Sequence, residues 1–248
     1  QVRVLLHLNG EDVDLTRSSK GTFDGSLDIA AVAFDDNGKV AQQVAQARIL
    51  NVPGESYESF VREGMVYSLT LPIKKAGPYQ VRIAVRDSSG RVGSDSQFVE
   101  VPEPGKSRLA VTGFIVQGAE GSDTRTSTSD QSSDPDISDR IKRNPAVRQF
   151  FTGDVLHYSY LIYGAQRAKG NGNLLTQVRL FRDADQVFAS DTEQVRANEI
   201  ADEGILAGGT LRLGSALKPG EYFLQVIVTD KSAPVERQVV DQWVDFAI

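Results

Sequence analysis

The chain has 248 residues with no cysteine, one tryptophan and two histidines, and its formal net charge is −6 at pH 7. The absence of cysteine excludes disulfides, thiolate zinc sites and a cysteine nucleophile. Two histidines leave little for a histidine-rich metal site, and the acidic balance argues against nucleic-acid binding. No apolar run reaches the roughly 18 residues of a transmembrane helix. The hydrophobic content, 40%, is sufficient for sizeable cores.

Alternation of apolar and polar residues predicts strands along most of the chain. The chain begins at Gln1 with a strand-like run, Val2–Leu8, as expected for the inside of a longer protein or a processed product. The runs Leu27–Phe34 and Val40–Ile49 flank Asp35-Asp36-Asn37-Gly38. They predict a hairpin, because Asn-Gly supplies the two positive-φ residues of a tight turn.

Helix signals are few. Residues 56–63, which end at Gly64, predict one short helix, and a second candidate lies between Thr192 and Glu203. The glycine-rich runs 170–173 and 207–209 lack the strand-to-helix context and the Lys-Ser/Thr pair of a phosphate loop. We therefore interpret both as hairpin turns.

The sequence contains an internal repeat with period-2 alternation. Two blocks have the same spacing of apolar residues between a tyrosine and an aspartate. The first block consists of Tyr79, Val81, Ile83, Val85 and Asp87, and the second of Tyr222, Leu224, Val226, Val228 and Asp230. This pattern is typical of the penultimate strand of an immunoglobulin-like sandwich, where a tyrosine returns its hydroxyl to the corner backbone. We expect that role for Tyr79 and Tyr222, and turn capping by Asp87 and Asp230.

Two copies of the block predict an all-β chain of two tandem immunoglobulin- or fibronectin-III-like β-sandwich domains, with one or two short helices. The run Pro102-Glu103-Pro104-Gly105-Lys106 cannot join a central strand ladder. We expect the first sandwich at 1–102, a short linker at 103–106 and the second sandwich at 107–248.

Each repeat block is followed by a second strand with a similar ending, 97–101 and 242–246. The repeat matches Phe98 with Trp243, and we expect both side chains in the cores. The second domain carries an insertion, 118–144, dominated by small polar residues. Such a segment buries too little apolar surface to offset its ordering entropy, which predicts a mobile loop or one ordered by a partner.

Three tyrosines are candidate contact residues. Tyr158 and Tyr160 share one face of a predicted strand, and Tyr163 lies on the other. Aromatic rings on an exposed sheet face can stack on sugars or anchor a protein partner. The alternative is that one of these faces belongs to the core.

Catalytic and metal signals are sparse. His157 and Asp154 could form a triad only with a distant serine, and no Gly-x-Ser-x-Gly elbow is present, so we predict that the chain is not an enzyme. The run Asp134-Pro135-Asp136-Ile137-Ser138-Asp139 loosely resembles a calcium loop. It lacks the turn glycine and the distal bidentate glutamate. Calcium is therefore an alternative, and solvated loop acids with no cofactor are the expectation.

Several runs carry a resemblance to a known family, namely Val2–Leu6, Val66–Arg82, Val92–Pro102, Thr176–Arg182 and Leu217–Phe246. They resemble the region downstream of the von Willebrand factor type A domain in acidobacterial VWFA-related proteins. The resemblance implies an exported protein at the cell surface or in the periplasm. The type A domain's Asp-x-Ser-x-Ser metal motif is absent here, so its metal-dependent adhesion transfers to no residue of this chain.

The sequence thus predicts a non-catalytic structural or protein-binding segment of an exported bacterial protein, which positions loops and edge strands for a partner. One alternative is a subunit of a surface filament or larger complex assembled through edge strands. Another is an accessory carbohydrate-binding module that uses the tyrosines as a stacking platform.

Overall fold

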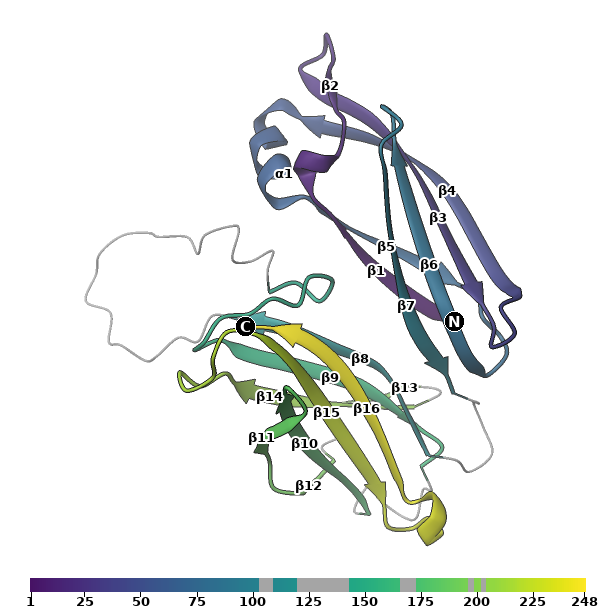
Figure 1. Ribbon diagram of the computed structural model, residues 1–248, viewed down its shortest axis with the longest axis vertical. Helices are drawn as coiled ribbons and strands as arrows, with labels where there is room; N and C mark the ends of the chain where they lie inside the picture. Colours follow the sequence, from purple (N-terminus) through teal and green to yellow (C-terminus); the bar gives the residue numbers. More distant parts are fainter. Residues whose placement is uncertain (103–108, 120–142, 166–172, 196–198, 202–203) are drawn as a thin grey trace, which may run out of the picture. The chain divides into compact units, whose positions relative to one another are not determined.

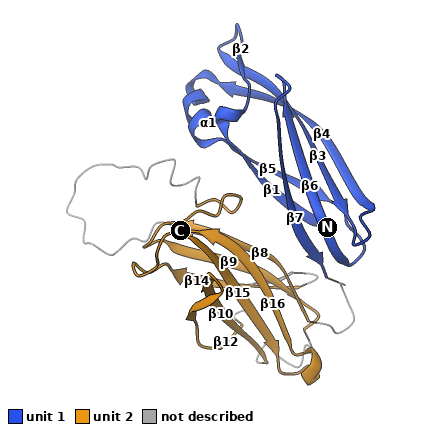
Figure 2. Ribbon diagram, viewed as in Figure 1, with its two compact units in different colours: residues 1–103 blue, residues 104–248 orange. Residues whose placement is uncertain are grey.

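The computed structural model describes residues 1–102, 109–119, 143–165, 173–195, 199–201 and 204–248. The chain divides into two compact units, unit 1 (1–103) and unit 2 (104–248), shown in Figure 2. Nearly every regular element is a strand, so the predicted all-β class is confirmed. The expected linker and all but the two ends of the expected insertion lie outside the described residues.

Unit 1 is a sandwich of two antiparallel sheets (Figure 1). The larger sheet has the order β4-β3-β6-β7, and the short strand β2 also pairs with β3. The smaller sheet contains β1 and β5. The strands are β1 (Val2–Leu8), β2 (Thr16–Arg17), β3 (Thr22–Phe34), β4 (Val40–Pro53), β5 (Met65–Leu71), β6 (Gly77–Asp87) and β7 (Val92–Val101).

The core of unit 1 lies between these two sheets. Alternate positions of β3, β5 and β6 point inward because side chains of a strand alternate between its faces. The buried residues include Leu27, Ile29, Ala31, Leu69, Leu71, Val81, Ile83 and Val85, and β1 adds the partly buried Val2, Val4 and Leu6. The two strands of the smaller sheet therefore cover the larger one on a single face.

The predicted hairpin is confirmed as β3 and β4, but its turn differs in detail. Of the turn residues only Gly38 has a positive φ, at 72°, and the turn closes with Asp35 N–H donating to the Lys39 carbonyl. The predicted helix is α1 (Tyr57–Glu63), preceded by the 3-10 turn η2 (Gly54–Ser56). It ends at Gly64, whose N–H donates to the Phe60 carbonyl and whose φ of 66° suits glycine.

Unit 2 is a second sandwich of two antiparallel sheets. One has the order β11-β10-β15-β16 with β12 also on β10, and the other has the order β13-β14-β9-β8. The strands are β8 (Ala110–Ala119), β9 (Val155–Tyr163), β10 (Leu174–Arg182), β11 (Asp185–Ala189), β12 (Glu193–Gln194), β13 (Glu199–Ala201), β14 (Gly204–Arg212), β15 (Glu221–Asp230) and β16 (Val239–Ala247). Short 3-10 turns lie at η1 (Gly10–Asp12) in unit 1 and η3 (Val235–Arg237) in unit 2.

Two local predictions in unit 2 are wrong. The second helix candidate instead contributes β12 and β13, and Gly208 and Gly209 lie inside β14 rather than in a turn. The reason at β14 is a close approach to β9. A Cβ at position 208 would collide with the Tyr158 carbonyl oxygen, and one at 209 would lie 2.5 Å from the Tyr158 hydroxyl.

The repeated blocks are β6 and β15, the inner strands next to β7 and β16. The Tyr79 hydroxyl donates to the Lys75 carbonyl at 2.8 Å, and the Tyr222 hydroxyl donates to the Lys218 carbonyl at 2.7 Å. These are the bonds that a tyrosine corner makes.

The aspartates that end the repeated strands both bond to the following turn. Asp87 Oδ1 accepts hydrogen bonds from the backbone N–H groups of Ser89 and Arg91 at 3.0 and 2.9 Å. Asp230 Oδ1 accepts one from the backbone N–H of Ser232 at 2.9 Å. Each carboxylate thereby fixes the turn that leads to the last strand of its unit.

The expectation that Phe98 and Trp243 are core residues is wrong. Phe98 lies opposite Gln80 and is 78% exposed, and Trp243 lies opposite Gln225 and is 44% exposed. Strand alternation is the reason, because their neighbours Val99 and Val244 already point inward. Both large rings therefore lie on the outer faces of the larger sheets.

Candidate functional site

The three candidate tyrosines do not form one exposed surface. Tyr160 is 1% exposed, its hydroxyl lies 2.9 Å from that of Thr176, and burial raises its pKa. Tyr158 is half-buried, and burial, then the proximity of Tyr160 and Glu193, raises its pKa to about 12. Tyr163 is half-buried on the other face of β9. Tyr160 has no ring face available to a ligand and belongs to the core.

The residues weighed for catalysis have other partners. His157 is exposed on β9 and lies opposite Thr210 of β14. Asp154 accepts two hydrogen bonds from the Arg143 guanidinium, each 2.8 Å long, and one of 2.9 Å from the Phe151 backbone N–H. Its carboxylate thus serves a buried ion pair with Arg143.

The acidic runs of the chain are the candidate ligands for a cation. Asp134–Asp139 lies outside the described residues. Within the described ranges, no group of three or more histidine, aspartate or glutamate side chains is arranged to hold a metal ion. In the same ranges, no helix is long and apolar enough to cross a membrane.

The outer face of the β10-β15-β16 sheet carries an aromatic patch made of Phe181, Phe223 and Trp243. The rings of Phe181 and Trp243 are tilted against each other with centroids 5.1 Å apart, and Phe223 is 45% exposed. Beside it, Asp241 Oδ2 accepts a 2.6 Å hydrogen bond from the Trp243 indole and one of 2.8 Å from the Gln225 amide. The indole is therefore held in one orientation while part of its surface meets solvent.

Gln225 shows how closely this patch packs. It lies on the outer face of the sheet between Arg179 and Trp243 in the strand register, yet it is only 8% exposed. Its Oε1 has no hydrogen-bond partner within the described part of the chain. The side chains above the sheet thus form a second, small packed layer rather than a set of freely moving surface groups.

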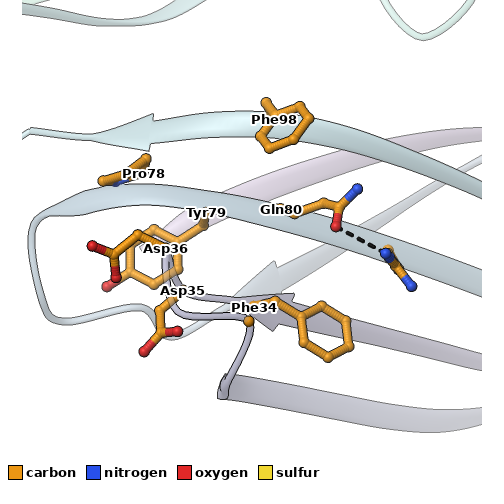
Figure 3. A pocket seen from close by; sticks show the side chains of 9 residues that line it. Phe34, Asp35, Asp36, Pro78, Tyr79, Gln80 and Phe98 are labelled. Atoms are coloured by element: carbon orange, nitrogen blue, oxygen red, sulfur yellow. Dashed lines mark hydrogen bonds between the residues drawn. The ribbon is translucent and has the colours of Figure 1, made fainter.

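Unit 1 has a shallow hollow of about 400 Å³ on the corresponding face, at the end of the sheet next to the β3–β4 turn. Figure 3 shows Phe98 from β7 and Phe34 from β3 on either side of Gln80 from β6, with Asp35 and Asp36 at one end. The Arg82 guanidinium lies 5.2 Å from the Phe34 ring centroid and donates to Gln80 Oε1 at 3.0 Å. The hollow is thus lined by the rings of Phe34 and Phe98, and the Gln80 amide and charged side chains lie at its margin.

The rest of this face of unit 1 carries the exposed ion pair of Asp28 and Arg86. A row of small residues crosses all four strands, from β4 to β7, and consists of Ala45, Ala30, Ala84 and Ser94. Large exposed apolar side chains flank this row toward the two ends of the sheet, namely Val40 and Phe98 on one side and Ile49 and Val92 on the other. Isolated apolar surface residues are ordinary, and several on one sheet face make it a candidate interaction surface.

No known protein family and no curated protein matches the chain. Among solved structures it is similar to a tetra-tandem repeat in the extending region of a large adhesion protein, with 15% identity and a TM-score of 0.27. The matched region covers 100% of this chain and 49% of the adhesion-protein chain. The dimeric latent PorU from Porphyromonas gingivalis has 11% identity and a TM-score of 0.28, over 92% of this chain and 20% of that one.

A third similar structure is the C-terminal domain of the AgI/II polypeptide BspA from Streptococcus agalactiae. It has 10% identity and a TM-score of 0.22, over 99% of this chain and 92% of that one. The chain therefore spans about half of the adhesion repeat and about a fifth of PorU. The identities and scores are too low to transfer a function, so the functional argument below depends on the surfaces of the chain itself.

Proposed function

We propose that the chain is a non-catalytic, protein-binding segment of an exported bacterial protein, in which two β-sandwich units present sheet faces and edges to a partner. The observation that carries this proposal is the placement of large aromatic side chains on outer sheet faces. Phe98 in unit 1 and Phe223 and Trp243 in unit 2 are exposed although each unit already has a filled core. Exposed aromatic patches of this kind are typical of protein interaction sites.

The chemistry of both faces favours a protein partner. Binding energy at protein interfaces concentrates in tryptophan, tyrosine and arginine side chains that fit into pockets. In unit 2, Trp243 is held by its hydrogen bond to Asp241, so little rotamer freedom remains to be lost on binding. In unit 1, the hollow beside Phe98 has room for one or two apolar side chains of a partner.

Site-specific photo-cross-linking in the cells that produce the protein tests this proposal. A photoreactive amino acid replaces Phe98 or Trp243, and matched controls carry it at exposed polar positions of the same units, Lys20 and Glu236. We expect discrete higher-mass adducts at 98 or 243 and none at 20 or 236. Equal labelling at all four positions, or no adduct at any, would contradict the proposal.

Export is supported by the resemblance to the region downstream of the type A domain in VWFA-related proteins. Cell fractionation tests it directly. We expect the protein in the surface, periplasmic or medium fraction, and recovery with the cytoplasmic proteins would contradict export.

The carbohydrate-binding alternative loses its original residues, because Tyr160 is buried and Tyr158 is half-buried. Among the described residues, the Phe181–Trp243 pair is an aromatic pair on an outer sheet face, and its planes are tilted by 46°. Flat stacking on a sugar requires a ring face that is free and level with its neighbours, so this geometry favours a protein partner. Retention on polysaccharide that Trp243→Ala abolishes would reverse that preference.

A further inference from the structure

Strand β4 is a long, open edge of unit 1. It runs for 14 residues, and β3 is the strand that hydrogen-bonds to it within the described ranges (Figure 1). At about 3.4 Å per residue, the edge is about 45 Å long. Its other side carries backbone N–H and C=O groups that no described strand pairs with, which is the template for adding a further strand.

The edge carries few of the devices that usually protect such strands. Natural edges are shortened, bulged, interrupted by proline or lined with charges, lysine in particular. Strand β4 has the sequence VAQQVAQARILNVP, with proline only at its last residue and Arg48 as its one charged side chain. Arg48 is turned to the core side, where its Nε donates to the Tyr67 hydroxyl at 2.7 Å. Charge is therefore absent from the outer face of the strand. Its protection is limited to a bulge at Ala41, the inward Arg48 and the terminal Pro53.

The side chains of β4 indicate which partner fits. Its other polar side chains over residues 42–46 are the three glutamine amides Gln42, Gln43 and Gln46, and each amide is both a donor and an acceptor. Gln46 Oε1 already accepts hydrogen bonds from the Tyr67 hydroxyl and the Arg48 guanidinium. The amides of Gln42 and Gln43 can satisfy their identical counterparts across a pair of identical strands. The chain as a whole carries a net charge of −6, which disfavours approach of a second copy over most of its surface. Strand β4 has no acidic residue, so no side chain of the strand itself adds to that repulsion.

From these properties we propose that β4 pairs antiparallel with β4 of a second copy of this chain, joining two five-stranded sheets into one. A two-fold axis makes such an interface self-complementary, since the same edge serves both partners. Exposed Val40 and Ile49, at 55% and 79% exposure, would gain apolar neighbours on the joined face. The inference deepens the proposed protein-binding function by naming one partner and the edge that receives it.

The test compares lysine substitutions at the two edges of one sheet. Ala45 and Ala47 lie exposed on the outer face of β4, and Ser94 of β7 belongs to the same cross-strand row as Ala45. The double variant Ala45→Lys/Ala47→Lys places like charges together in a β4–β4 pair, whereas Ser94→Lys charges the opposite edge. Size-exclusion chromatography with light scattering over a wide concentration range gives the mass of each protein.

We expect the wild-type mass to rise with concentration from 27.0 kDa toward twice that value. The double variant should raise the dimer Kd by about 100-fold or more, since it places like charges side by side across the interface. The Ser94→Lys control should behave as wild type. Far-UV circular dichroism checks folding, and if the double variant is unfolded, Gln43→Lys on the same face replaces it.

A monomeric wild type at every concentration would overturn the proposal, and so would a dimer that only Ser94→Lys disrupts. A dimer that neither edge variant weakens would also overturn it. The outcome is separable from that of the proposed function, because cross-linking at positions 98 and 243 to other proteins does not depend on β4.

Discussion

Unit 1 and unit 2 share the tyrosine corner and the strand that follows it, but their sheets end differently. The larger sheet of unit 1 ends in β4 and β7, of 14 and 10 residues. In unit 2 the corresponding sheet ends on one side in β11 and β12, of five and two residues. On the other side, the end of β16 is capped by residues 148–150, where Phe150 N–H donates to the Ala247 carbonyl.

The second sheet of unit 2 is protected in the same manner. It ends in the three-residue β13 and in β8, which has an irregular register between Thr112 and Ile115 around Gly113. Short and bulged strands are the usual means of preventing unwanted strand pairing. The comparison teaches that the same sandwich plan can have short or partly capped edges in one unit and a 14-residue edge in the other.

The units also differ in how they hold charge, and this difference predicts the largest effect on stability. Arg143 and Asp154 form a buried ion pair in unit 2, whereas Arg86 and Asp28 form an exposed one in unit 1. Asp154→Ala leaves a buried guanidinium without its carboxylate and should lower the free energy of unfolding of unit 2 by about 3–5 kcal/mol. The sole tryptophan, Trp243, lies in unit 2, so its fluorescence in a denaturant titration reports that unit.

The control is Arg86→Ala. Both side chains of its salt bridge are more than half exposed. The variant should therefore change the free energy of unfolding of unit 1 by less than about 1 kcal/mol. Circular dichroism measures the unfolding of this variant. If both variants lowered the free energy of unfolding by the same amount, the buried pair would not stabilise unit 2 more than the exposed pair stabilises unit 1.

Strand glycines provide the next comparison. Gly208→Ala places a Cβ against the β9 backbone at Tyr158, and overpacking of this kind costs about 1–3 kcal/mol. Gly93 also lies in a strand, β7, and a Cβ there meets nothing within 4 Å. Gly93→Ala should therefore be neutral or slightly stabilising. Thermal unfolding of both variants checks this, and a neutral Gly208→Ala would refute the close approach of β14 to β9.

The tyrosine corners should respond alike in both units. Tyr79→Phe and Tyr222→Phe each remove one hydrogen bond to a backbone carbonyl, of Lys75 or Lys218, and keep the buried ring. Each substitution should lower the free energy of unfolding of its unit by about 1 kcal/mol. Denaturant unfolding with a unit-specific signal measures both, and a large cost in one unit alone would show that the two corners are not equivalent.

The smallest expected effect is a pH dependence in unit 1. Burial raises the pKa of Asp87, but hydrogen bonds from Ser89, the Asp14 backbone N–H and Arg91 outweigh burial and lower it to about 2. A carboxyl whose folded pKa is depressed stabilises the fold above its unfolded pKa, near 3.8, and this contribution is lost as pH falls toward 2. In the Asp87→Asn variant, the free energy of unfolding of unit 1 should fall less steeply as the pH drops below about 4. An unchanged profile would contradict this role.

Local patterns in the sequence were enough to predict the hairpin of β3 and β4, the helix α1 and the repeated strands β6 and β15. Each of these depends on near-neighbour alternation or on a single glycine such as Gly64. The match of Phe98 with Trp243 in the repeat predicts equivalent places but not the core, because strand alternation assigns Val99 and Val244 to the inner face.

Features that depend on distant pairing could not be predicted. Gly208 and Gly209 have the composition of a turn, and only the approach of Tyr158 from β9 explains them inside a strand. The core position of Tyr160 follows from the sheet of β10 that packs on it, where Thr176 contacts its hydroxyl. The open edge of β4 likewise follows from the order of strands in the sheet, which the linear sequence does not contain.

The most direct test of the account is a distance measurement between two copies of the chain. Because the protein has no native cysteine, Ala45→Cys and Ser94→Cys each accept a single spin label, and pulsed electron paramagnetic resonance measures the distance between labels in the dimer. Pairing through β4 predicts a short distance for position 45. It predicts a separation of about seven strand spacings, roughly 34 Å, for position 94. A short distance at position 94 and a long one at position 45 would contradict the assignment of β4 as the self-pairing edge.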